Sequence, residues 1–253
     1  MNLPNGRDLG GLRTESGATV RSGRVLRAAA PLSPEHAAAL AEFGVTHALD
    51  LRTKEERDLR PVVVPEATAV VPVDLLADEP EAGPASLGAI ARAALAGDTA
   101  ALTPDRLDQI FVTGYRSFVT LGSARTATAT VLQQVADPDS GPVVIHCTAG
   151  KDRTGWVIAV LLTAVGVSWD DVMADYLRSG PEVLALFAPY RDRVAEQGGD
   201  IEAMERAIAV FPHYLEAARD QMVGDFGSWD RYLSDGLGLK SGARDSLHAQ
   251  LLA

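Results

Sequence analysis

Residues 142–155 read Pro-Val-Val-Ile-His-Cys-Thr-Ala-Gly-Lys-Asp-Arg-Thr-Gly, and they join two apolar runs of different character. The run 143–145 is short, apolar and β-branched, which is typical of a buried strand. The second apolar run begins near Arg153 and continues through Leu162, which favours a helix. The sequence therefore predicts a strand and a helix joined by a tight turn, with Cys147 where the turn begins.

The turn between Cys147 and Arg153, six positions apart, is suited to bind a dianion. A loop of this length that ends at a helix start can curl so that its backbone N–H groups point to one spot, and the helix N-terminus adds positive potential. The same field lowers the pKa of a cysteine thiol, from about 8.5 to roughly 3.5–7.5 at helix N-termini or beside cations. The loop is therefore predicted to bind phosphate and to hold a thiolate against the phosphorus.

The segment from Cys147 to Thr154 resembles the Cys-x5-Arg-Ser/Thr motif of the cysteine-dependent protein tyrosine phosphatase superfamily. Its form Ala-Gly-Lys-Asp-Arg-Thr-Gly resembles a bacterial branch typified by a mycobacterial secreted tyrosine phosphatase. Three further blocks resemble the same branch: Asn5-Gly6-Arg7-Asp8-Leu9-Gly10-Gly11, Leu49-Asp50-Leu51-Arg52-Thr53 and Asp175-Tyr176-Leu177-Arg178-Ser179. The matching blocks extend from the N-terminus to the region of Tyr232, so the resemblance covers most of the chain.

The order of the predicted elements indicates an α/β fold. Short strands are predicted in the first part of the chain, at 25–28, 45–51 and 69–73, and helices dominate the second part. A central, mostly parallel sheet flanked by helices is expected, as in the superfamily that the chain resembles. No repeat or linker divides the 253 residues, so a single phosphatase domain over 1–253 is predicted.

Several helix ends are marked by local signals. Ser33 is predicted to cap a helix that ends at Gly44, and Thr53 begins a capping box. Ser168 is predicted to cap a helix that runs to Arg178, where the pair Gly180-Pro181 is expected to end it.

Residues 74–115 are predicted to form a lid-like insertion beside the site. Over 74–103 the composition is rich in Asp, Glu, Pro, Gly and Ala, and the apolar periodicity is weak. The branch that the chain resembles carries a mobile helical lid in the corresponding region, for which Gly83, Gly88 and Gly97 could serve as hinges. An ordinary surface loop would explain the composition equally well.

Each step of phosphate transfer can be assigned to a residue of the loop. Cys147 is predicted to attack phosphorus and become a cysteinyl-phosphate, and Arg153 offers a planar fork of donors to the phosphate oxygens. The resemblance implies that His146 supports the loop and the thiolate through hydrogen bonds. Thr154 could donate to the cysteine sulfur or simply start the helix. The phosphate is predicted to bind the residues of the turn, which are Thr148, Ala149, Gly150, Lys151, Asp152 and Arg153.

The general acid that protonates the leaving group has two candidates. Larger tyrosine phosphatases use an aspartate in a Trp-Pro-Asp loop, and this chain has no such sequence. Asp152 lies within the phosphate loop, where the resembled branch also has an aspartate, and Asp74 follows a predicted strand. We favour Asp152, whose pKa would have to be raised by burial or by the bound phosphate.

Lys151 widens the range of expected substrates. A lysine at this place resembles the loop lysine of phosphoinositide phosphatases, which meets additional ring phosphates, although a lysine at the rim could also merely face solvent. Arg7 and Asp8 are interpreted as a structural pair that holds the N-terminal arm. Weaker pocket candidates, which at helical spacing are more often core, are Tyr115, Arg116, Asp175, Tyr176 and Arg178.

The composition is that of an ordinary globular domain, with 47% hydrophobic and 23% charged residues. The formal net charge of -11 argues against nucleic acid as a partner, so any attraction for phosphate must be local. No cofactor or metal is predicted, because the histidines outside the loop lack metal-ligand spacing: His36, His47, His213 and His248.

The single cysteine and the N-terminus indicate a cytoplasmic location. Cys147 has no partner for an intrachain disulfide, and a reactive thiol suits a reducing compartment. The first residues lack the apolar core of a signal peptide, and the apolar run 156–167 is too short to span a membrane. Stable membrane insertion is not expected, and export without a signal peptide is left open.

Three other functions were weighed against a phosphatase. A nucleotide-binding loop would need glycine where Ile145 stands and a hydroxyl residue where Asp152 stands. A rhodanese-type sulfur transferase also uses one cysteine in an anion-binding loop, but Arg153 fits phosphate better. A phospho-ligand binding module would not need the cysteine. The sequence favours a metal-independent cysteine phosphatase for phosphotyrosine, with phosphoserine, phosphothreonine or phosphoinositides as further substrates.

Overall fold

The computed structural model describes residues 2–79 and 103–253. Its sheet has five strands in the order β1-β2-β5-β3-β4, in which β1 is antiparallel to β2 and the remaining pairs are parallel. The strands are β1 Arg7–Asp8, β2 Val25–Ala29, β3 His47–Asp50, β4 Ala69–Pro72 and β5 Val143–Cys147. The predicted α/β fold with a mostly parallel central sheet is confirmed, and the strand that carries Cys147 lies at its centre.

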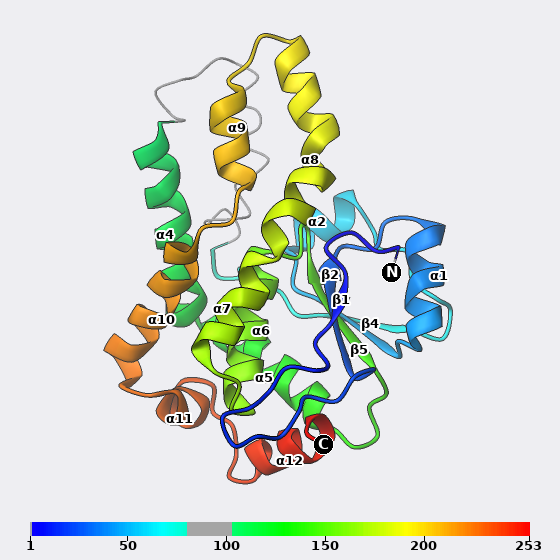
Figure 1. The fold of residues 1–253 in the computed structure, drawn as a ribbon, viewed down its shortest axis with the longest axis vertical. Helices are drawn as coiled ribbons and strands as arrows, with labels where there is room; N and C mark the ends of the chain where they lie inside the picture. Colours follow the sequence, from blue (N-terminus) through cyan, green and yellow to red (C-terminus); the bar gives the residue numbers. More distant parts are fainter. Residues whose placement is uncertain (1, 80–102) are drawn as a thin grey trace.

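Helices cover both faces of the sheet (Figure 1). One helix, α1, lies on one side, and α4 to α7 and α10 lie on the other, while α8 and α9 extend beyond the sheet at the top of Figure 1. The helices before β5 are α1 Pro34–Phe43, α2 Lys54–Leu59, α4 Pro104–Thr120 and α5 Gly122–Ala136. Those after it are α6 Asp152–Ala164, α7 Trp169–Leu177, α8 Ser179–Glu196, α9 Ile201–Ile208, α10 Pro212–Phe226, α11 Trp229–Arg231, the π-helix η2 Tyr232–Gly236 and α12 Ala243–Leu251.

The alternation of side chains along the strands divides the core in two. On β5, Val143, Ile145 and Cys147 face the large cluster under α4–α7 and α10, and Val144 faces a smaller cluster. Helix α1 closes the smaller cluster with Ala39 and Leu40. Cys147 therefore belongs to the helix-rich face of the sheet.

Local signals predicted both ends of α1 and the start of α2 correctly. Ser33 accepts a hydrogen bond from the N–H of His36 at the start of α1, and Gly44 ends that helix at φ 79°. The Thr53 capping box is formed at the start of α2, with Glu56 as its second member. These signals succeed because each depends on residues that are neighbours in the sequence.

The prediction that Gly180-Pro181 ends a helix is wrong. Helix α7 ends at Leu177, and the next helix, α8, already begins at Ser179. Pro181 thus lies in the first turn of α8, where a backbone N–H has no partner within the helix and proline costs little.

The predicted insertion is described only at its two ends. Residues 104–115 form the first part of α4, where Leu107, Phe111 and Tyr115 are fully buried in the main core. The suggested hinges Gly83, Gly88 and Gly97 lie outside the described residues, so the lid stays a prediction.

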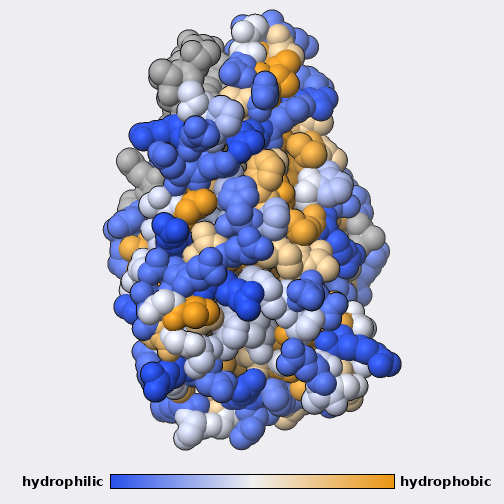
Figure 2. Space-filling model, turned by 60° about the vertical axis from the view of Figure 1, so that its left-hand side comes forward, coloured by the Kyte–Doolittle hydropathy of each residue, from blue (hydrophilic) through white to orange (hydrophobic). Residues whose placement is uncertain are grey.

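Hydrophilic residues cover most of the face shown in Figure 2, and hydrophobic residues appear there in small groups between them. Within 2–79 and 103–253, no helix combines the length and the apolar character that crossing a membrane requires.

We predict that the small cluster under α1 contributes a substantial part of the stability. Leu40 is fully buried there, so Leu40→Ala should lower the free energy of unfolding by about 2–5 kcal/mol. Leu59, at the end of α2, is 79% exposed, so Leu59→Ala should change it by less than about 0.5 kcal/mol. Urea denaturation of both variants checks this, and equal losses would contradict the packing described for α1.

Candidate active site

Cys147 is the last residue of β5, and α6 begins at Asp152, so residues 148–151 turn between a strand end and a helix N-terminus. The Cys147 side chain is 2% exposed. Because β5 lies between the parallel strands β2 and β3, the turn stands at the carboxyl end of the sheet, where ligands bind in open α/β folds.

The backbone carbonyls of the turn are all held by groups outside it. Four successive carbonyl oxygens, those of residues 148 to 151, accept hydrogen bonds from other parts of the chain. The bonds are Ala30 N–H to Thr148 O (3.3 Å), Asn5 Nδ2 to Ala149 O (2.9 Å), Arg27 Nη2 to Gly150 O (2.8 Å) and Gly155 N–H to Lys151 O (2.7 Å).

These bonds orient the N–H groups of the turn. A trans peptide is planar, so its N–H points away from its C=O, and the N–H groups of residues 149–152 point opposite to the four held carbonyls. In the described part of the chain, no backbone carbonyl accepts a hydrogen bond from the N–H groups of residues 149–153. Together with the N-terminus of α6, these donors form a cradle for an anion.

Gly150 makes the shape of the turn possible. Its φ is +68°, in the left-handed region that favours glycine. A Cβ at this position would stand 2.3 Å from the carbonyl oxygen of Ala28, which is backbone of the neighbouring strand. Glycine is therefore required here by both conformation and space.

Arg153 is held by Glu56, a residue of α2. Its Nη1 and Nη2 atoms donate to the two Glu56 carboxylate oxygens at 2.5 and 2.8 Å. The Nε of Arg153 is buried and has no hydrogen-bond partner among the described residues. One edge of the guanidinium is thus occupied, and the edge with Nε keeps its donor capacity.

The ion pair also fixes the charges of both groups. Burial alone would raise the pKa of Glu56, but the charge and hydrogen bonds of Arg153 lower it to about 2. Burial alone would lower the pKa of Arg153, but Glu56 raises it above its ordinary value. Glu56 accepts a further hydrogen bond from the hydroxyl of Thr148 in the turn.

Sequence analysis missed Glu56 as a site residue. The sequence marks it only as the second member of the Thr53 capping box, and it performs this role, since Oε2 accepts from the Thr53 N–H at 2.9 Å. A capping glutamate carries no sign of its partner, and Arg153 is 97 positions away.

Asp152 turns its side chain toward helices α4 and α7. Its Oδ1 accepts from the Tyr115 hydroxyl at 2.9 Å, which in turn lies 2.7 Å from the Tyr176 hydroxyl. The side chain is nearly fully buried, and burial raises the pKa of Asp152 above its ordinary value. The Oδ2 atom makes no hydrogen bond within the described residues, so the carboxyl keeps one oxygen for another partner.

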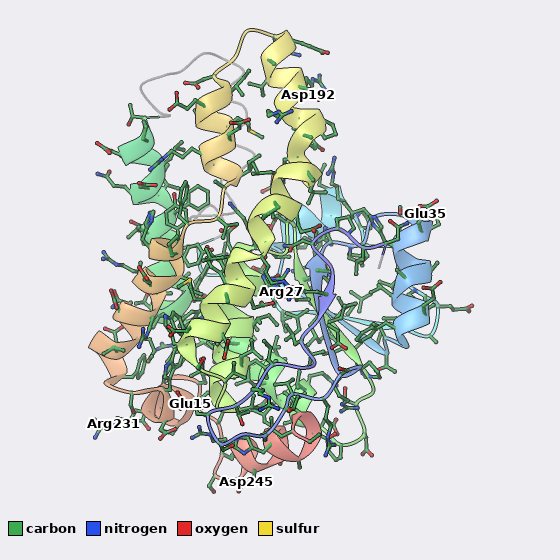
Figure 3. The ribbon with its side chains drawn as sticks, in the orientation of Figure 1. Glu15, Arg27, Glu35, Asp192, Arg231 and Asp245 are labelled. Atoms are coloured by element: carbon green, nitrogen blue, oxygen red, sulfur yellow. The ribbon has the colours of Figure 1, made fainter. Side chains whose placement is uncertain are left out.

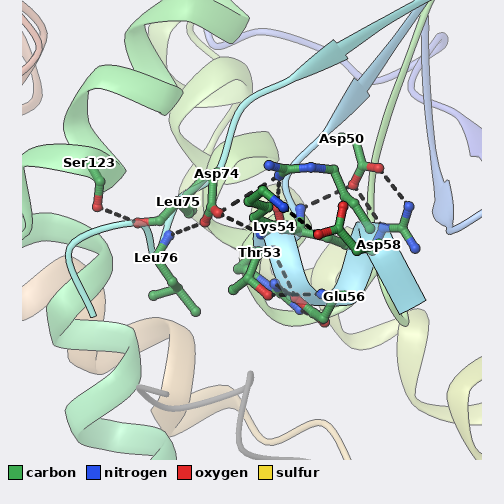
Figure 4. A network of polar contacts seen from close by, with 12 residues as sticks. Asp50, Thr53, Lys54, Glu56, Asp58, Asp74, Leu75, Leu76 and Ser123 are labelled. Carbon is green, nitrogen blue, oxygen red and sulfur yellow. Dashed lines mark hydrogen bonds and ion pairs between the residues drawn. The ribbon is translucent and has the colours of Figure 1, made fainter. Parts of the chain in front are cut away.

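Asp74 follows β4 in the chain, and its side chain lies beside the first residue of α2. Both of its carboxylate oxygens accept hydrogen bonds (Figure 4). Oδ2 accepts from the backbone N–H of Lys54 and Oδ1 from that of Leu76, both at 3.0 Å. The guanidinium of Arg57 stands 3.8 Å away. In this arrangement Asp74 connects the end of β4 to α2.

The Lys151 ammonium does not stand at the rim of the site, contrary to the sequence-based interpretation. The side chain is fully buried, and Nζ donates to the carbonyls of Ala207 and Ala209, both at 3.0 Å. It also lies 4.9 Å from the ring centre of Phe111. Carbonyls at the end of α9 and an aromatic face satisfy the ammonium, while the Lys151 backbone N–H remains in the cradle.

The supporting role of His146 stays a prediction. Its ring nitrogens have no close hydrogen-bond partner among the described residues, although the backbone of Cys147 lies near enough to raise the pKa of the ring. Side chains alternate along β5, which places His146 opposite to Cys147, with Nδ1 3.8 Å from Asp50 Oδ1. Burial lowers the pKa of His146 to about 4, despite the Asp50 carboxylate. The Thr154 hydroxyl is buried and likewise lacks a partner among the described residues.

Arg7 and Asp8 do not pair with each other, although the sequence suggested it. Adjacent strand residues point to opposite faces, so Arg7 reaches Asp175 on α7 at 2.7 Å. Asp8 instead accepts from the N–H groups of Gly10 (3.0 Å) and Gly23 (2.8 Å). The N-terminal arm is thus held, but by different partners.

Proteins that are similar to this chain in sequence have related names. A model described as the tyrosine phosphatase family matches residues 1–253. A Cupriavidus necator protein named as a tyrosine-protein phosphatase is 30% identical over 237 residues, which are 93% of this chain and 82% of its own. The triple specificity protein phosphatase PtpB of Mycobacterium tuberculosis is 30% identical over 245 residues, with 87% and 88% covered. The solved structure of P. aeruginosa TpbA aligns at 17% identity with a TM-score of 0.36, covering 76% of this chain and 89% of its own.

The buried neutral His146 predicts a loss of stability in mild acid. A histidine whose pKa is lower in the folded than in the unfolded state contributes stability at pH values above its unfolded pKa. That contribution is lost as the pH falls toward and through the folded pKa. The pKa of His146 is about 6.5 in the unfolded chain and about 4 in the folded protein. This difference corresponds to about 3 kcal/mol of folding stability, which is lost as the pH falls from the first value to the second. The free energy of unfolding should therefore fall more steeply across this pH range in the wild type than in His146→Gln.

Urea denaturation at several pH values checks this prediction. His213 is 43% exposed, so His213→Gln serves as the matched control for replacing a histidine that is not enclosed in the core. An unchanged pH dependence in His146→Gln would show that the imidazole is not buried in its neutral form.

Proposed function

Because the chain belongs to the tyrosine phosphatase family, we propose that it hydrolyses phosphotyrosine in proteins through a covalent phosphate on Cys147. The observation that carries the proposal is the cradle of free N–H groups around the single cysteine, with the Nε edge of Arg153 beside it. Such an arrangement offers donors to every non-bridging oxygen of a phosphate monoester.

In the first step the Cys147 thiolate attacks phosphorus, and a sulfur–phosphorus bond forms as the bond to the phenolic oxygen breaks. The phenolate leaves with the electron pair of that bond and takes a proton from a general acid. The turn N–H groups and Arg153 stabilise the charge on the three remaining phosphate oxygens. Because Glu56 holds the other edge of the guanidinium, Arg153 needs no rearrangement to offer Nε.

Asp152 is the better candidate for the general acid. Its raised pKa favours the protonated carboxyl that the first step requires, and Oδ2 is not engaged by a described residue. Asp74, in contrast, accepts backbone hydrogen bonds on both oxygens, so both are already engaged within the protein.

In the second step a water molecule attacks the cysteinyl-phosphate. The sulfur–phosphorus bond breaks, inorganic phosphate leaves, and the thiolate is restored. The Asp152 carboxylate accepts the proton of this water, so the acid of the first step is regenerated. In the proposed second step the Thr154 hydroxyl, which has no hydrogen-bond partner among the described residues, donates to the departing sulfur.

Phosphoserine and phosphothreonine are included in the proposed substrates, and the name of the triple specificity relative supports more than one class. Phosphoinositides are a weaker part of the proposal. Their main support in the sequence was Lys151, whose ammonium is committed to Ala207 and Ala209. A lipid substrate would have to draw it out of a buried position.

We predict that Cys147→Ser abolishes turnover. Serine lacks a nucleophile that is ionised near neutral pH, so phosphate release from a phosphotyrosine peptide in chelator should fall to background. Phosphoserine peptide and phosphoinositide are assayed beside it to rank the substrates. A wild type that binds phosphotyrosine peptide without releasing phosphate would replace the proposal with a binding module, and sulfur transfer from thiosulfate would point to a rhodanese-type activity.

The two aspartates can be separated by leaving group and pH. Asp152→Asn should lower kcat on phosphotyrosine peptide by about 10²–10⁴-fold and remove the basic limb of the pH–rate profile. The loss should shrink for an aryl phosphate whose phenol is acidic, since that leaving group needs less protonation. Asp74→Asn is the matched control and should keep the basic limb. The opposite pattern would assign the acid to Asp74.

A further inference from the structure

Two of the groups that hold the turn from outside are side chains from the first part of the chain. Arg27, on β2, donates to the Gly150 carbonyl, and Asn5 donates to that of Ala149. Arg27 is fully buried between the sheet and the helices that cover it (Figure 3). Neither residue touches the concave side of the turn, so both act on it from behind.

Arg27 is itself fixed by a buried charge cluster, which we call the loop clamp. Its Nη1 pairs with Asp175 Oδ2 at 2.5 Å, and the same carboxylate accepts from Arg7 Nε at 2.7 Å. Ser179 Oγ accepts from both guanidinium groups, at 3.1 Å from Arg7 and 3.3 Å from Arg27. Arg7 Nη1 donates in turn to Asn5 Oδ1 at 2.8 Å, so the clamp consists of Asn5, Arg7, Arg27, Asp175 and Ser179.

The loop clamp carries an excess of positive charge. Two arginines share one aspartate, and all three side chains are at most 9% exposed. Burial and the nearby Arg27 lower the pKa of Arg7 to about 10, so it remains charged at neutral pH. Burial alone would raise the pKa of Asp175, but Arg27 and Arg7 lower it. A net positive charge therefore lies under the turn, in an environment that screens it poorly.

Arg27 stands on the same side of the sheet as Cys147. In the parallel pair of β2 and β5, Arg27 is opposite Ile145 and Ala29 is opposite Cys147, so Arg27 lies one step back along the same face. An anion at the centre of the turn, either the thiolate or a phosphate, is attracted by the charge of the clamp as well as by the N–H groups.

We propose that Arg27 is a positioning residue for phosphate transfer, which holds the Gly150 carbonyl so that the turn N–H groups face the Cys147 sulfur and the phosphate. Asp175 and Arg7 orient Arg27, and Asn5 performs the same task at Ala149. The inference deepens the proposed function and rests on it for the role in turnover, but the geometry of the turn can be tested without turnover.

The test uses the only cysteine as its own reporter. The rate of alkylation of Cys147 by iodoacetamide is measured against pH, which gives the titration midpoint of the thiol, and protection by inorganic phosphate gives a Kd. In Arg27→Met the midpoint should rise by about one pH unit and the Kd for phosphate should increase about tenfold. The variant loses both the positive charge and the hydrogen bond that the charged group donates. Asn5→Ala removes a neutral donor, so it should weaken phosphate binding with a smaller change of the midpoint.

Arg52 offers a matched control. It is 2% exposed, is paired with Asp50 at 2.7 Å and donates to one carbonyl, that of Arg60 at 2.8 Å. Like Arg27 it is therefore a buried arginine that joins an aspartate to a backbone carbonyl, but that carbonyl is not part of the turn. Arg52→Met should lose comparable stability in urea but keep the midpoint and the phosphate Kd within about twofold of the wild type. Equal effects in Arg52→Met and Arg27→Met would overturn the proposal, because general loosening would then explain both.

Arg27→Lys keeps the proposal testable if Arg27→Met does not fold. A single ammonium cannot serve Asp175 and Gly150 in the geometry of the arginine fork, so phosphate binding should weaken although the charge is kept. Wild-type phosphate binding in a folded Arg27 variant would refute the role. A wild type that shows protection by phosphate, and loses it in the Arg27 variants, but has no turnover would refute the proposed function and leave the role of the loop clamp intact.

Discussion

A peptide group cannot present its carbonyl and its N–H on the same side, and the candidate site depends on this constraint. The turn after β5 becomes a donor-lined cradle only because four successive carbonyls are drawn outward by partners elsewhere. Two of these partners are backbone groups, from the end of β2 and the first turn of α6. The other two are the side chains of Asn5 and Arg27. The sheet and α6 set the position of the turn, and the side chains set the direction of its dipoles.

The charges around the turn follow a common pattern. Arg153 is paired on one edge by Glu56, and Arg27 shares Asp175 with Arg7. Buried ions are expensive unless they are paired and hydrogen-bonded, and here both carboxylates, Glu56 and Asp175, also fix the direction of an arginine. Two positive features near the turn remain. The Nε edge of Arg153 has no partner among the described residues, and the loop clamp contains two arginines for one aspartate. The chain can thus bind a dianion locally while its formal net charge is -11.

The strand–turn–helix unit and the ends of α1 could be predicted because their signals lie within a few residues of each other. The mostly parallel sheet was predicted from the order of the elements and the family resemblance, without β1. The side-chain directions could not be predicted in the same way. Lys151 belongs to the turn by sequence, but its ammonium points to Ala207 and Ala209, more than fifty positions along the chain. Glu56 gave only its local capping signal, and Arg7 and Asp8 suggested a pair that the alternation of a strand forbids. Proline in Gly180-Pro181 was taken as a helix end because sequence does not show where the following helix begins.

The loop clamp also affects when the site can exist during synthesis. Its members come from the N-terminal arm, β2 and the junction of α7 with α8, and the contact of Arg7 with Ser179 joins positions 172 apart. Contacts of such long sequence separation form late, because the intervening chain must be ordered first. A nascent chain that already contains the whole turn therefore still lacks the groups that orient it. The cradle is completed only when the segment through Ser179 has left the ribosome and the first strand has docked against it.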